Sequence, residues 1–213
     1  MRSTPTWHLP LACLGLVVVA LSGCASMSKS ECAAVDWKTI GYEDGAAGRS
    51  GERIADHRRA CVKYGVVPDL DLYQVGRQQG LREYCRPENG YRVGVSGGSY
   101  EGLCPAEMGD AFVNAYDSGR KLYSLRRRVT HNASQIEYAR NEIDHAEHEI
   151  IERAVVLVST DASGEARAQA LVSTQQLAER VGRLKAKVSD LERDQARYER
   201  ELAEYRTANS PTT

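Results

Sequence analysis

The sequence lacks a charge excess, a membrane-spanning apolar run and any cysteine beyond residue 104. Lys and Arg total 28 against 29 Asp and Glu, so the net charge of −1 gives no electrostatic reason to expect a nucleic-acid partner. The longest apolar run, from Leu9 to Leu21, is shorter than the ~20 residues that a spanning helix needs. Any disulfide within the chain is therefore confined to its first half.

The first residues have the pattern of an export signal. A basic start at Arg2 precedes the apolar run, and the run ends in Leu21-Ser22-Gly23-Cys24. A small residue before a cysteine at this place resembles the bacterial lipobox. The resemblance implies cleavage after residue 23, a lipid on Cys24 and a short lipidated tether over residues 24–31. Ala25 follows the cysteine in place of the Asp that favours inner-membrane retention, which implies the outer membrane, facing the periplasm.

Four cysteines remain after removal of the signal and lipidation of Cys24, and they are Cys32, Cys61, Cys85 and Cys104. An even number in an oxidising compartment predicts two disulfides, for which three connectivities are possible. We favour Cys32–Cys61 with Cys85–Cys104, because sequential pairing closes two short loops. A four-cysteine zinc site is disfavoured because no pair has the close spacing that zinc ligands use.

Residues 32–105 form a small disulfide-stapled helical unit rich in Gly and Tyr. The motif Tyr-x-x-Gly recurs at Tyr42, Tyr73, Tyr91 and, just beyond the unit, Tyr116. Gly41, Gly45 and Gly48 fall on one helical stripe, as do Gly76 and Gly80. We expect small helices docked through glycines against aromatic rings, although the same glycines could be turns.

Two further segments of this unit have their own signals. Residues 56–65 read as a helix that carries Cys61 and ends at Gly65. Residues 87–105 contain two turn-like clusters, at 87–90 and 96–99, and predict a loop with at most a short hairpin.

The second half has the pattern of a coiled coil. Apolar residues recur every seven positions from Leu122 to Leu157, and a second series runs from Leu177 to Tyr205. The short polar break at residues 159–164 favours an antiparallel hairpin over residues 106–207, with a disordered tail at 208–213. The fold class is therefore mainly α, with a small disulfide-stapled helical unit followed by a long coiled-coil hairpin.

Many spaced motifs over residues 30–128 together resemble an uncharacterised bacterial lipoprotein family, domain of unknown function 2799. The resemblance rests on Asp36-Trp37, Gly41-Tyr42-x-Asp44-Gly45, His57, Ala60-Cys61, Tyr73-x-x-Gly76-Arg77-x-x-Gly80-Leu81, Tyr84-Cys85-x-Pro87-x-Asn89-Gly90, Gly94, Gly97, Tyr100-x-Gly102-x-Cys104-Pro105 and Ala115-Tyr116-x-x-Gly119. It implies a lipoprotein and brings no catalytic residue to carry over.

Two patterns formally match chemical sites. Residues 94–98 read G-x-S-x-G, but that nucleophile elbow needs a strand-to-helix turn, which the pattern does not predict. Glu142, His145 and His148 follow one helical face, but a di-iron bundle needs a second Glu-x-x-His motif. We therefore predict no enzymatic activity, no metal and no cofactor.

Val155, Val156, Leu157 and Val158 form an apolar run at the predicted hairpin tip. Four consecutive apolar residues cover more of a helix than a two-stranded seam buries, so the run is a candidate contact site unless Ala168, Leu171 and Val172 cover it. We expect a structural or adaptor lipoprotein that contacts an envelope protein or a second copy of itself. The alternative is a module that binds a small ligand or glycan through exposed tyrosines of residues 73–105.

Overall fold

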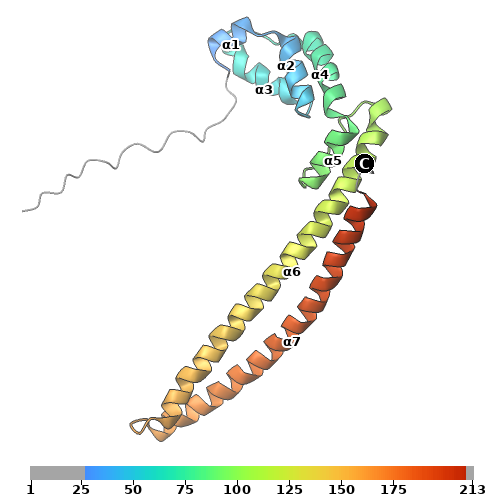
Figure 1. Cartoon of the computed structure of the whole chain (residues 1–213). Helices are drawn as coiled ribbons and strands as arrows, with labels where there is room; N and C mark the ends of the chain where they lie inside the picture. Colours follow the sequence, from blue (N-terminus) through green and yellow to red (C-terminus); the bar gives the residue numbers. More distant parts are fainter. Residues whose placement is uncertain (1–26, 210–213) are drawn as a thin grey trace, which may run out of the picture.

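The computed structural model describes residues 27–209, and this range is helical without strands (Figure 1). The predicted signal peptide, Cys24 and the last four residues lie outside the described residues. The helices are α1 (Lys29–Ala34), α2 (Trp37–Ala46), α3 (Arg53–Val62), α4 (Leu70–Tyr84), α5 (Pro87–Val95), α6 (Ala106–Val158) and α7 (Gly164–Ala208). None of these helices is long and apolar enough to cross a membrane.

Short polar side chains begin most of the helices. Ser28 and Glu31 form a reciprocal capping box at α1, so ordered structure starts within the segment predicted as a tether. Asp36 accepts a hydrogen bond from the Lys38 amide at α2, and Asp69 does the same for the Leu72 amide at α4.

Two pairs of helices pack backbone to backbone through glycine. In the first pair, a Cβ added to Gly41 of α2 would lie 2.0 Å from the Tyr73 carbonyl oxygen of α4. A Cβ on Gly76 of α4 would lie 1.8 Å from the Lys38 carbonyl oxygen. Contacts advance along both helices together, so the helices run in the same direction. Only glycine allows so close an approach.

The second pair repeats this arrangement with α5 and the start of α6. A Cβ added to Gly94 would lie 2.2 Å from the Tyr116 carbonyl oxygen, and one on Gly119 would lie 2.3 Å from that of Tyr91. Gly41, Gly45, Gly48, Gly76 and Gly80 were predicted to dock on aromatic rings. The structure corrects this for the helical glycines, which dock on the backbone of the partner helix.

The contacts match position by position between the pairs. Each glycine on the first helix of one pair corresponds to the glycine 49 positions later in the other pair (41 to 90, 45 to 94, 48 to 97). Their contact residues on the second helix correspond with an offset of 39 positions (73 to 112, 77 to 116, 84 to 123). Gly48 and Gly97 both have positive φ, and their α-carbons face the rings of Tyr84 and Tyr123. We call residues 37–84 the first unit and residues 87–123 the second unit.

In each unit a crossover segment connects the two packed helices, over residues 47–69 in the first unit and 96–105 in the second. A disulfide joins each crossover to the segment before the first helix of its unit. Cys32–Cys61 joins α1 to α3, with Cα atoms 5.5 Å apart. Cys85–Cys104 joins the residue after α4 to the crossover 96–105, with Cα atoms 5.6 Å apart. Both predicted pairings are confirmed.

The loop predicted over residues 87–105 is wrong in its first half, where the structure has α5. Pro87 occupies the first helical turn, which its fixed φ suits. Gly90 and Gly94 are buried against α6. Glycines that resemble turn residues in the sequence are here helix-packing positions.

Helices α6 and α7 form the predicted antiparallel hairpin (Figure 1). Predicted seam residues make two apolar clusters, one around Leu122 and Leu202 and another around Ile143 and Val181. The Tyr205 hydroxyl donates to the Ser118 carbonyl oxygen at 2.8 Å, so α7 returns to the second unit. Because α6 also supplies the second helix of that unit, unit and hairpin share one helix.

Candidate functional sites

The predicted contact tip lies at the far end of the hairpin from the two units (Figure 1). Val155 is 62% exposed and Val158 is 81% exposed, while Val156 and Leu157 are half-buried. Ile151, one turn before Val155 on the same face, is also exposed. Only part of the predicted run therefore faces solvent.

Helix α7 does not cover the tip. Leu171 and Val172, two of the residues that could have folded over it, are 61% and 56% exposed. They lie about as far from the turn as Ile151 does. We call Ile151, Val155, Val158, Leu171 and Val172 the tip patch.

The formal chemical motifs do not assemble into sites. Ser96 follows the last turn of α5, and its hydroxyl donates to the Val93 carbonyl oxygen. His145 and His148 are exposed on α6, and each pairs with a glutamate one turn on, Glu149 and Glu152. Among residues 27–209 no group of three His, Cys, Asp or Glu side chains is arranged to hold a metal ion.

The tyrosines of residues 73–105 do not form an open stacking surface. Tyr73 is 1% exposed, and Tyr84 and Tyr100 are half-buried against Phe112. Among these tyrosines, Tyr91 alone is exposed, at 38%. The alternative function based on exposed tyrosines is therefore not favoured.

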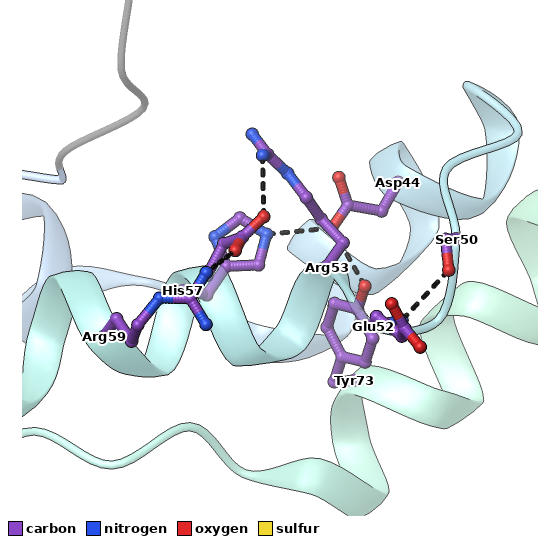
Figure 2. Close-up of polar contacts among 8 residues, drawn as sticks. Asp44, Ser50, Glu52, Arg53, His57, Arg59 and Tyr73 are labelled. Atoms are coloured by element: carbon purple, nitrogen blue, oxygen red, sulfur yellow. Dashed lines mark hydrogen bonds and ion pairs between the residues drawn. The ribbon is translucent and has the colours of Figure 1, made fainter.

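A buried polar cluster, absent from the sequence-based predictions, joins three helices of the first unit (Figure 2). An Asp44 carboxylate oxygen of α2 accepts from the Tyr73 hydroxyl of α4 at 2.9 Å and lies 2.8 Å from His57 Nε2 of α3. His57 is only 9% exposed, and the Trp37 ring meets it edge-on. His57 and Tyr73 lie 13 and 29 positions after Asp44 in the sequence, so no single local motif contains all three residues.

The cluster makes Tyr73 a weak acid. Burial, followed by the hydrogen bond to the Asp44 carboxylate, raises the pKa of the Tyr73 phenol above its ordinary value near 10. The phenol therefore stays protonated and keeps donating to Asp44. Chemically the cluster is a clamp, because its three side chains face one another and hold the α3 crossover on the α2–α4 pair.

The same place in the second unit is apolar. Phe112 is the counterpart of Tyr73. Val93, which lies 49 positions after Asp44, is the counterpart of Asp44. Phe112 packs against Tyr84 and Tyr100, with ring centroids 5.4 and 4.7 Å away. The architecture thus tolerates either a polar or an aromatic filling.

Comparison with known proteins agrees with these boundaries. No curated protein and no solved structure matches the chain. A family model described as "Protein of unknown function (DUF2799)" matches residues 36–121. The match begins at the cap of α2 and ends two residues before Tyr123, so it spans both units and stops where the free hairpin begins. Residues 36–121 are therefore a DUF2799 domain, built from two stapled parallel helix pairs.

Proposed function

We propose that the chain is a non-enzymatic structural or adaptor lipoprotein of the cell envelope, which contacts a second copy of itself through the tip patch. The observation that carries this proposal is the exposure of five large apolar side chains at the tip. Exposed apolar side chains that gather at one end of a folded protein are typical of contact sites.

The chemistry of the tip patch favours a second copy over a charged partner. Both helices contribute apolar side chains, so the patch can meet itself across a two-fold axis. The surrounding side chains carry both signs, with Glu152 and Glu165 against Arg153 and Arg167. Two copies can therefore approach without strong repulsion.

The N-terminal motif supports the other half of the proposal. Lipid on Cys24 would attach the chain to the outer membrane on its periplasmic side, and several acyl chains anchor far more firmly than one. The anchor would lie before the first unit, whereas the tip patch lies at the far end of the hairpin. The chain would then hold its contact surface away from the membrane.

The test compares the solution mass of the oxidised chain with that of a variant carrying Val155→Ser, Val158→Ser and Leu171→Ser. We expect the parent chain to exceed its monomer mass in light scattering, and the variant to be monomeric. Circular dichroism should show the same helix content in both, because the substituted side chains face solvent.

A matched control places three serines at Val62, Val67 and Val75, which are similarly exposed in the first unit. This control should keep the mass of the parent chain. A monomeric parent chain at high concentration, or an oligomer that persists in the tip variant, would overturn self-association through the tip.

A further inference from the structure

The first unit contains a pocket at a place where an aromatic ring packs in the second unit. The pocket measures about 210 Å³ and lies between the α3 crossover and α4. Ile54, Leu70 and Tyr73 make its apolar side, Gln74, Arg77 and Gln78 make its polar side, and Gly51 borders it without a side chain. We call it the Arg77 pocket.

Arg77 takes the place of a neutral residue. Its Nη2 donates to the Arg49 carbonyl oxygen at 3.0 Å. Its counterpart Tyr116 makes the equivalent bond, from its hydroxyl to the Gly98 carbonyl oxygen, at the same 3.0 Å. A phenol thus makes the same backbone contact, so this hydrogen bond alone does not require a charged residue at position 77.

The Arg77 guanidinium has an unused donor. Its Nε is buried and has no hydrogen-bond partner, and the same holds for Nε of Arg53, the residue before Ile54. Buried donors in native proteins are nearly always paired. No carboxylate is among the residues that line the pocket. A guanidinium in the wall of a cavity whose lining has no carboxylate is suited to an anion.

The second unit indicates the shape of the missing group. There the Tyr100 ring packs on both counterparts of the pocket wall, 4.7 Å from the Phe112 ring and 5.9 Å from the Tyr116 ring. In the first unit the space beside Tyr73 and Arg77 is bordered by Gly51. One aromatic ring thus covers these positions in one unit, while the other has a cavity there.

We infer that the Arg77 pocket binds a small organic carboxylate, whose ring-sized apolar body packs on Tyr73 and Ile54 and whose carboxylate pairs with the Arg77 guanidinium. The volume is below the 300–1,000 Å³ of drug-sized sites, so the ligand is correspondingly small. This inference is independent of the tip patch and of the proposed self-association.

The probe is benzoate, with the neutral benzamide as its isostere. In ¹H–¹⁵N NMR titrations of the oxidised chain, benzoate should shift the signals of Gly51, Gln74 and the Arg77 side chain. It should bind about tenfold or more tightly than benzamide, because a charged acceptor strengthens the bond to the guanidinium. Absence of these shifts, or equal binding of the two probes, would overturn the inference.

Two variants separate binding from folding. Arg77→Gln removes the guanidinium and keeps a polar side chain, and it should lower benzoate affinity about tenfold or more. Arg82→Gln, an equal charge change at an exposed position of the same helix, should leave affinity unchanged. Gly51→Phe should fill the pocket and abolish binding with Arg77 still present. Retained binding in both pocket variants would rule the site out even if one of them were less stable.

Discussion

The two stapled units have the same backbone plan and different interiors. Both pack two parallel helices through glycine and tie the crossover with a disulfide. In the first unit Asp44 contacts Tyr73 of the second helix and His57, whereas in the second unit the counterpart of Tyr73, Phe112, packs against the Tyr100 ring. Features common to both are what the architecture requires. Features of one unit alone are where stability, pH response or binding can differ.

The helix crossing should respond most strongly to substitution. Gly76→Ala places a methyl group against the Lys38 carbonyl oxygen, so the helices must separate, and we expect a loss of about 3 kcal/mol of unfolding free energy. The second unit has Ala115 at the corresponding position, 39 residues on, so Ala115→Gly should cost no more than about 1 kcal/mol. Urea denaturation of the two variants measures the difference.

Gly109→Ala is the control for the crossing, because a Cβ there meets no atom within 4 Å and should slightly stabilise α6. If Gly76→Ala cost no more than Gly109→Ala, the close approach of α2 and α4 would not contribute to stability.

The polar cluster should have a smaller effect. Asp44→Val introduces the second unit's residue but leaves the Tyr73 hydroxyl and His57 Nε2 without their acceptor, at a cost of about 2 kcal/mol. Adding Tyr73→Phe removes one orphaned donor and should recover part of this loss. A double-mutant cycle from urea denaturation gives the coupling between the two residues.

Asp117→Val, at an exposed position of α6, should change stability by less than about 0.5 kcal/mol. Additive effects of Asp44→Val and Tyr73→Phe would contradict the hydrogen bond between these side chains.

The smallest effect concerns alkaline pH. Because the folded-state pKa of Tyr73 is raised, the unfolded chain releases this proton from about pH 10, where the folded chain retains it. The contribution of the Tyr73 phenol to the unfolding free energy is fully present below about pH 10 and is lost as the pH rises further. The Tyr73→Phe variant has the second unit's residue at this position and lacks this alkaline loss. The difference in unfolding free energy between the variant and the parent chain should therefore shrink between pH 8 and pH 11.

Tyr138→Phe removes a phenol that is 62% exposed, and its stability difference from the parent chain should not change with pH. An alkaline loss of stability that is the same in the parent chain and in Tyr73→Phe would assign the loss to other groups, Tyr84 among them, since burial also raises the pKa of that phenol.

Local and periodic signals predicted the hairpin and the staples. The heptads from Leu122 to Leu157 and the polar break after Val158 place α6 and α7 almost to the residue. Sequential cysteines gave the disulfides. Helix α5 was missed because Gly90 and Gly94 have low helix propensity, and their burial against α6 outweighs it.

The duplication and the candidate pocket could not be predicted in this way. The four Tyr-x-x-Gly motifs are visible in the sequence, but the structural match pairs Tyr73 with Phe112 and Arg77 with Tyr116, across crossovers of unequal length. The clamp joins Asp44, His57 and Tyr73 only when three helices meet. A useful signal was Asp44 beside Gly45, because a carboxylate next to a helix-crossing glycine lies close to the neighbouring helix.

The helix shared between the second unit and the hairpin has a mechanical consequence. Helix α6 runs through 53 residues, about 80 Å at 1.5 Å per residue, and contains no proline. Its first turns pack against α5 through Gly94 and Gly119, and its last turns carry Ile151, Val155 and Val158 of the tip patch. Because α6 is one continuous helix, we expect a force applied at the tip to reach the contact between Gly94 and Gly119, near the Cys85–Cys104 disulfide.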